Sequence, residues 1–247
     1  MRTVRILLIF TLAFTFISCE KIGSGKKIRV GMDPALYPMN FMGKESYIDG
    51  FVDELFLEIA KASGANFEMI PANWDSVKDK LWDDQYDAIV SLMPELGHTL
   101  QFYDFSEEIL LVGPILIVPV KSKYSNLGKM KNKRIGYIAG EDSILILEKY
   151  PDIISQSYNS ITDLLNAVAK DEIDGALAEV IVASSYVRDL YKDKLKLVGD
   201  PLTDEALRLV AIKGENEQLI SFFNKYLSKL KRSNKYKTLL RKWSLAP

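Results

Sequence analysis

A stretch that predicts a helix and then a strand decides the fold; it reads GFVDELFLEIAKASGANFEMIP over residues 50–71. Phe51, Leu55 and Ile59 repeat at intervals of four, so they would share one face of a helix predicted over 50–64. A buried face of this kind needs a sheet or another helix to pack against. The stretch therefore predicts one unit of a layered protein that contains both helices and strands.

The same alternation continues on both sides of this stretch. Asp49 is predicted to cap the start of the helix and Gly64 to end it. Strands are predicted over 27–31, 67–71, 86–92, 133–138 and 175–178, and further helices over 74–82, 142–150, 160–170, 179–190, 215–231 and 235–243. Strands that alternate with helices predict an α/β fold with largely parallel sheets.

Two stretches depart from this alternation. Residues 108–120 form a long extended run that contains Pro114, and residues 207–213 form another. Two such segments are what a chain needs to pass into a second domain and to return, so they predict two domains joined by two crossings.

The first residues carry an export pattern. Arg2 and Arg5 precede a short apolar run over 6–17, which is too short to cross a bilayer and is typical of a signal peptide. Ser18 and Cys19 follow, and a small residue before a cysteine is typical of a lipoprotein cleavage site. We expect residues 1–18 to be removed and Cys19 to be lipidated, with 19–25 as a tether. The alternative is an incidental cysteine at the end of an ordinary signal peptide.

Charge and cysteine content exclude several classes of protein. The formal charge is −1, and it becomes about −3 when the two arginines of the signal are removed, which argues against nucleic acid as a partner. Cys19 is the only cysteine, so no disulfide within the chain is possible, and His98 is the only histidine, which argues against a zinc site. We expect no metal and no cofactor.

Several short segments in one order carry a resemblance to a known family. They read KIRVGMD at 27–33, NWDSVKDKL at 73–81, YDAIVSLM at 86–93, YDFSEE at 103–108, RIGYIAG at 134–140, EIDGALAE at 172–179 and YKTLLRKW at 236–243. In this arrangement the chain resembles the polar-amino-acid solute-binding proteins of ABC importers, the bacterial extracellular solute-binding proteins of family 3.

The resemblance implies a type II periplasmic-binding-protein fold, in which two α/β lobes are joined by two crossing strands and hold the ligand in a cleft. The first lobe would comprise 26–112 and 207–247, and the second 113–206. It also implies an exported protein, held on the periplasmic or extracellular face by its lipid. Its partners would be a small polar solute, such as an amino acid or an amine, and the permease and ATPase subunits of the importer.

The family pattern implies a set of ligand-binding positions, some of which this chain keeps. Glu179 stands where the family has an aspartate for the ammonium group of the ligand. Trp74 stands at the position of an aromatic platform, and Asp33 at an acidic position that some members use. Ser91 and Met93 match the strand end that lines the cleft.

Other ligand-binding positions depart from the family pattern. The aromatic residue expected near Leu36 is displaced to Tyr37. The arginine that holds the ligand carboxylate is missing, because the position holds Thr99 in an ungapped alignment, or Leu96 if Pro94-Glu95 is aligned with the family motif. A Gly-Thr-Thr loop reads Gly140-Glu141-Asp142.

These substitutions would give an acidic cleft without a fixed cation, which favours a cationic or neutral solute stacked on Trp74 and Tyr37. A basic amino acid would still need a donor for its carboxylate. More ordinary interpretations remain open. Asp142 and Glu179 suit the starts of helices, Glu141 could face solvent, and the aromatics could serve only in packing.

Two other functions are also compatible with the sequence. One is an enzyme, because the family fold is known to host dehydratases. Catalysis would need a pair of carboxylates in different environments, such as Glu179 with Glu141 or Asp142. The sequence contains none of the common nucleophile, zinc-protease or nucleotide-binding motifs, so we predict no catalytic residues. The other alternative is a sensor or surface antigen that no longer supports transport.

Overall fold

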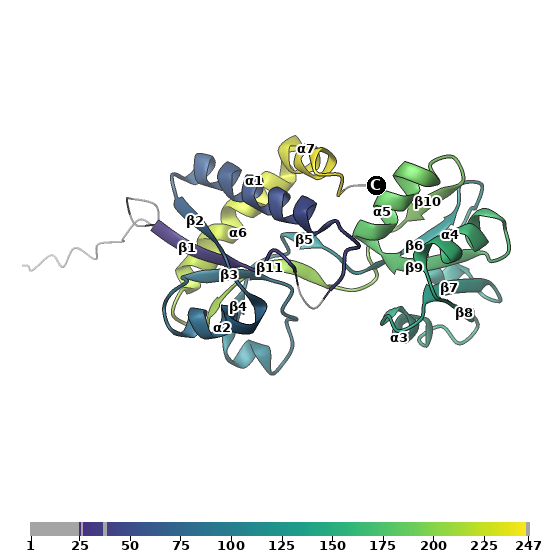
Figure 1. The fold of residues 1–247 in the computed structure, drawn as a ribbon, viewed down its shortest axis with the longest axis horizontal. Helices are drawn as coiled ribbons and strands as arrows, with labels where there is room; N and C mark the ends of the chain where they lie inside the picture. Colours follow the sequence, from purple (N-terminus) through teal and green to yellow (C-terminus); the bar gives the residue numbers. More distant parts are fainter. Residues whose placement is uncertain (1–24, 26, 37–38, 246–247) are drawn as a thin grey trace, which may run out of the picture.

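The computed structural model describes residues 25, 27–36 and 39–245, which form two lobes, each built around its own β-sheet. In Figure 1 the lobe with the early purple strands and the yellow C-terminal helices lies beside the green lobe. The predicted signal peptide, Cys19 and Tyr37 lie outside the described residues. The sheets confirm the predicted α/β class.

The first lobe contains the six-stranded sheet, in the order β2-β1-β3-β11-β4, with β5 paired to β11. Its strands are β1 (Lys27–Met32), β2 (Asn66–Pro71), β3 (Ala88–Ser91), β4 (Tyr103–Phe105), β5 (Leu110–Leu111) and β11 (Ala206–Ile212). Its helices are α1 (Glu45–Ser63), α2 (Trp74–Trp82), the 3₁₀ turn η1 (Thr99–Gln101), α6 (Glu217–Arg232) and α7 (Asn234–Lys242). Figure 1 shows α1, α6 and α7 over one face of this sheet and α2 over the other.

The second lobe contains a five-stranded sheet in the order β10-β6-β9-β7-β8. Its strands are β6 (Pro114–Pro119), β7 (Arg134–Ile138), β8 (Ile154–Tyr158), β9 (Gly175–Glu179) and β10 (Leu195–Val198). Its helices are the 3₁₀ turn η2 (Leu127–Lys129), α3 (Ser143–Leu147), α4 (Ile161–Ala169) and α5 (Val180–Leu190). The two sheets therefore draw their strands from separate parts of the sequence, as the two extended runs predict.

Helix α1 shows how the apolar pattern becomes a core. Phe51, Leu55 and Ile59 are all buried, and Gly64 ends the helix in the left-handed conformation at φ 77°, as predicted. The start differs from the prediction. The helix begins at Glu45, so Asp49 lies inside it and does not cap it.

The central strands of the first sheet set the position of the site. β1 pairs in parallel with both β2 and β3, so that Val30 lies opposite Met69 on one side and Ala88 on the other. The carboxyl ends of these three strands therefore meet at one edge of the sheet. In open α/β sheets this edge is where ligands bind.

The chain passes between the lobes in two tightly packed segments. One runs from β5 through Gly113 into β6, and the other runs through Glu205 into β11. Val112 donates its backbone N–H to the carbonyl of Glu205 at 2.9 Å, which holds the two segments together. A Cβ on Gly113 would lie 2.0 Å from the hydroxyl of Thr203, so a larger residue would have to displace that side chain.

The sequence pattern does not indicate three strands, β4, β8 and β10, and α3 ends at Leu147 instead of the predicted Tyr150. All three strands lie at the edge of a sheet. Edge strands are partly solvated and short, so they need no strong apolar pattern. Within the described part of the chain, no helix is both long enough and apolar enough to cross a membrane.

Candidate ligand-binding site

The predicted residues of the first lobe follow the carboxyl ends of neighbouring strands. Asp33 comes directly after β1, Trp74 begins α2 a short turn after β2, and Ser91 is the last residue of β3. The three positions are brought to one edge of the sheet because β2, β1 and β3 are adjacent. This edge is where a ligand between the lobes would meet the first lobe.

Asp33 and Leu36 shape the segment after β1. The Asp33 carboxylate accepts the backbone N–H of Ala35 at 3.0 Å, and its side chain remains half exposed. Leu36 adopts a positive φ of 55° and is buried with the core of the first lobe. The segment thus presents Asp33 to solvent and directs Leu36 inward.

Trp74 is half buried at the first position of α2. Asn73 caps the helix by accepting the backbone N–H of Asp75 at 2.9 Å. One side of Trp74 packs against an apolar cluster, and Lys78, one turn further along the helix, lies 5.7 Å from the centre of its ring. The packing interpretation and the platform interpretation of Trp74 are therefore compatible.

Hydrogen bonds between its own residues hold the segment after β3 in place. The hydroxyl of Ser91 accepts the backbone N–H of Met93 at 3.0 Å, and both side chains are buried. Thr99 is 9% exposed, and its hydroxyl donates to the carbonyl of Pro94 at 2.7 Å while accepting the N–H of Leu96 at 2.9 Å. The hydroxyls of Ser91 and Thr99 are therefore already engaged in hydrogen bonds with the backbone of their own segment.

The second lobe brings together the three predicted acidic residues. Glu179 ends β9, while Glu141 and Asp142 lie in the loop between β7 and α3. Asp142 and Glu179 both occupy N-cap positions, but neither side chain makes a capping hydrogen bond. One carboxylate oxygen of Glu141 and one of Glu179 are buried without a hydrogen-bond partner. The capping interpretation therefore does not explain these acids.

The electrostatics of this group are unusual. Burial raises the pKa of Glu179 to about 8, and three neighbouring carboxylates add to the shift; they are, in order of effect, Glu205, Glu141 and Asp142. Burial also raises the pKa of Glu141. We call these four residues the acidic cluster. A cation placed among them would replace repulsion with attraction.

Glu205 is not among the residues predicted from the sequence. Its carboxylate accepts the hydroxyl of Thr203 at 3.0 Å, and one of its oxygens lies 3.2 Å from where a Cβ on Gly113 would be. The carbonyl of Gly113 in turn accepts the N–H of Val180, next to Glu179. The crossing thus brings Glu205 beside β9. The one sequence feature that could have indicated Glu205 is its place just before the extended run over 207–213, where the chain was predicted to cross between domains.

Arg208 was also missed, although an arginine inside an otherwise apolar strand is a clear signal. Its side chain is buried and donates to the carbonyl of Ser106 at 3.0 Å. It also forms ion pairs with Glu108 at 3.3 Å and Glu95 at 3.7 Å. Arg208 therefore ties the crossing segment to the loop after β3.

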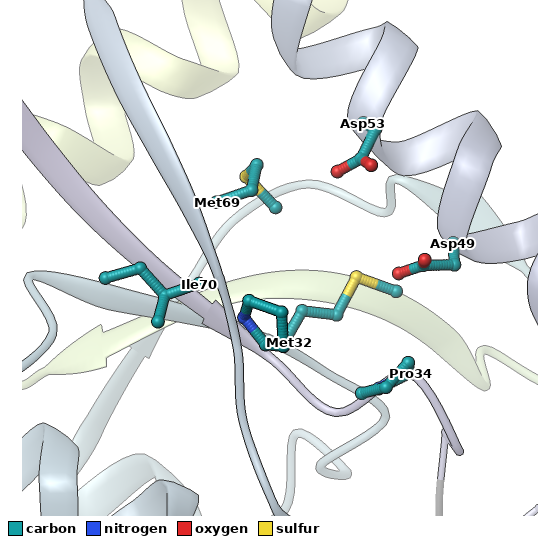
Figure 2. A pocket seen from close by; sticks show the side chains of 7 residues that line it. Met32, Pro34, Asp49, Asp53, Met69 and Ile70 are labelled. Carbon is teal, nitrogen blue, oxygen red and sulfur yellow. The ribbon is translucent and has the colours of Figure 1, made fainter.

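A separate pocket of about 100 Å³ lies on the first lobe, beneath the start of α1 (Figure 2). Asp49 and Asp53 point into it from successive turns of the helix, opposite Met32 and Met69 (Figure 2). Burial raises the pKa of both carboxyls, and for Asp53 the charge of Asp49 adds to the effect. Among the described residues, none of the predicted ligand-binding positions lines this pocket.

The architecture is that of the type II periplasmic binding proteins, and solved structures of this class are similar to it. The L-cystine solute receptor of Neisseria gonorrhoeae, in its unliganded open conformation, matches with a TM-score of 0.71 at 17% identity, covering 92% of this chain and 98% of that chain. The second substrate-binding domain of GlnP from Lactococcus lactis, in an open conformation, matches with a TM-score of 0.65 at 18% identity, covering 88% and 94%.

The chain belongs to the bacterial extracellular solute-binding proteins, family 3, which match it over residues 28–246. It is 25% identical over 246 residues to the arginine-binding extracellular protein ArtP of Bacillus subtilis, covering 94% of this chain and 93% of that protein. It is 24% identical to a probable histidine-binding protein of Campylobacter jejuni, covering 88% and 85%. The family resemblance predicted from the sequence is confirmed.

Proposed function

We propose that this chain is the extracytoplasmic solute-binding component of an ABC importer and that it takes a small, positively charged polar solute between its lobes. The observation that carries the choice of ligand is the buried, unpartnered carboxylate oxygen of Glu179 in the acidic cluster. Family membership supports the transport role. The function of the Bacillus subtilis relative, which binds arginine, supports a basic ligand.

The physical argument rests on the cost of burying charge. An ionised carboxylate without a partner is expensive to bury, so Glu179 is held in its neutral form near pH 7. A ligand ammonium or guanidinium would supply the missing partner and allow Glu179 to ionise. Binding of a cation should therefore be coupled to loss of the proton from Glu179.

The remaining parts of the proposal concern location and partners. Residues 1–18 would direct export, and lipidated Cys19 would hold the protein at the outer face of a membrane. Rotation of the lobes about the crossing segments would close them over the ligand. The permease would then distinguish the closed form from the open form, and the ATPase would drive release and transport.

Thermal unfolding in the presence of candidate ligands tests the proposal. The panel would contain basic, neutral and acidic amino acids together with amines and guanidines. A ligand present at 100 times its dissociation constant should add about 2.7 kcal/mol to the stability, which raises the unfolding midpoint. Stabilisation by basic compounds alone supports the proposal. Stabilisation by acidic amino acids contradicts it, and stabilisation by no compound favours a sensor or surface antigen.

Glu179→Gln should weaken binding of the stabilising cation about 100-fold, because the amide cannot ionise to pair with the ligand. The measurement is calorimetric titration of the variant and the original protein. Glu148→Gln is the matched control, since Glu148 is an exposed residue of the same lobe outside the acidic cluster. Equal losses in the two variants would argue against a specific role for Glu179.

One observation favours a second function. A carboxyl group with a pKa of about 8 that lies among other carboxylates is suited to act as a general acid. The fold alone does not decide between binding and catalysis. Incubation of the stabilising ligand with the protein, followed by mass spectrometry, separates the two, because a transport component returns its ligand unchanged.

A further inference from the structure

The binding site contains attraction for a cation but lacks a partner for a carboxylate on the same ligand. Family members that bind amino acids are expected to hold the carboxylate with an arginine after β3. Here that position holds Thr99, whose hydroxyl is hydrogen-bonded to Pro94 and Leu96 within its own loop. The alternative position, Leu96, carries an apolar side chain that is 50% exposed.

Arg208 does not fill the missing role. It lies beside the end of β3, because it pairs with Ser91 across the sheet. Its guanidinium, however, binds the carbonyl of Ser106 and is neutralised by Glu108 and Glu95. To bind a ligand carboxylate, Arg208 would have to abandon contacts that hold the crossing segment in place.

The opposing loop of the second lobe is also unsuited to an anion. The backbone N–H of Glu141 is engaged with the carbonyl of Ile138 at 3.2 Å. The side chains of Glu141 and Asp142 add negative charge where the family pattern has two threonines. A ligand carboxylate placed here would meet two like charges at short range, which is destabilising.

We propose that the ligand is an organic cation without a carboxylate, such as an alkyl amine or a guanidine, held by Glu179 and Glu205 together. This proposal rests on the proposed function and defines its ligand class more narrowly. Glu205 is suited to this role because Thr203 fixes its carboxylate from one side and the crossing at Gly113 places it beside the end of β9. A molecule with positive charge at both ends would satisfy both carboxylates.

The test compares each basic amino acid with the amine formed by loss of its carboxylate. Arginine is paired with agmatine, lysine with cadaverine and ornithine with putrescine, and each is titrated into the purified protein by calorimetry. Each pair differs in the carboxylate alone and shares the same side chain. We expect at least one amine to bind about tenfold or more tightly than its amino acid.

The outcomes separate this inference from the proposed function. If an amino acid binds more tightly than its amine, the inference is wrong although a cation-binding site remains. If neither member of any pair binds, both proposals fail. Lys78→Gln is included because Lys78 lies beside Trp74 and is a basic group that could meet a ligand carboxylate. Loss of amino-acid binding in Lys78→Gln would show that Lys78 binds the ligand carboxylate, and this result would contradict the inference.

Glu205→Gln tests the second carboxylate. The variant should weaken binding of the diamine about tenfold and binding of a monoamine of equal length much less, since only the diamine has a second charge to pair. Asp204→Asn is the control, because it removes the charge of the adjacent exposed residue. Equal weakening of diamine and monoamine by Glu205→Gln would show that Glu205 does not contact the second charge.

Discussion

Two arginines of the first lobe and the acidic cluster differ in whether their charges are paired. In the first lobe, Arg29 donates from its side chain to Asp87 at 3.1 Å, and its backbone N–H donates to the same carboxylate at 2.7 Å. Arg208 is likewise matched by Glu108, which Lys231 also approaches at 3.7 Å. Each of these buried or half-buried charges has a partner within the protein.

In the second lobe, the acidic cluster leaves oxygens of Glu141 and Glu179 without any partner. An arrangement of this kind costs folding free energy, so it needs a reason other than stability. The comparison teaches that paired charges mark the framework and unpaired charges mark the place where a ligand completes the structure. Three experiments test this distinction, from the largest expected effect to the smallest.

Arg208→Leu should lower the free energy of unfolding by about 3 kcal/mol, because the buried carbonyl of Ser106 loses its charged donor and Glu108 and Glu95 lose an ion-pair partner. Burial opposes ionisation of Glu108, yet its own backbone N–H, Arg208 and Lys231 together lower its pKa. The measurement is denaturant unfolding at pH 7. Arg232→Leu, at an exposed position of α6, should change stability by less than about 0.5 kcal/mol. Similar losses in both variants would contradict a framework role for Arg208.

The stability of the free protein should fall as the pH rises from 5 to 8. The pKa of Glu179 is raised from 4.5 to about 8, so the folded state binds a proton that the unfolded state releases in this range. We expect a loss of about 2 kcal/mol, less than the full shift implies because the side chain keeps some contact with solvent. Urea unfolding across this range should show a shallower slope in Glu179→Gln. Parallel slopes would show that Glu179 does not carry the effect.

Leu96→Arg should restore part of the missing carboxylate site. Leu96 is 50% exposed and is one of the two positions aligned with the family arginine, so the substitution costs little packing. We expect the affinity for basic amino acids to rise about tenfold relative to their amines, as measured by titration of the same pairs. Leu100→Arg, an exposed change in the same loop, controls for the added charge. An equal gain in both variants would indicate non-specific attraction of the ligand carboxylate to the added positive charge.

The sequence predicts the interior of the fold better than its edges. β1, β3 and β9 are mostly apolar and lie between two neighbours, and their residues alone indicate strands with a buried side. β8 reads ISQSY and β10 reads LKLV, and both lie at the edges of the second sheet. An edge strand forms because it pairs with a neighbouring strand. The residues of the edge strand alone do not reveal that pairing.

The site shows the same limit. Glu141, Asp142 and Glu179 were found because each stands at a position of the family pattern. Glu205 has no such position, and its part in the acidic cluster depends on how the second crossing packs against Gly113. Contacts between residues so far apart in the sequence are decided by the fold. Tyr37, which lies outside the described residues, stays a prediction.

The crossing at Gly113 has a mechanical consequence. Pro114 pairs with Glu179, and Glu205 hydrogen-bonds through its backbone to Val112, so both carboxylates are attached directly to the crossing segments. In any rotation of one lobe against the other, atoms close to the axis travel least. Glu179 and Glu205 would therefore keep their spacing while Trp74 and Glu141 sweep through larger arcs. A solute that enters the open form would therefore meet Glu179 and Glu205 already in position, and closure would bring Trp74 and Glu141 toward it.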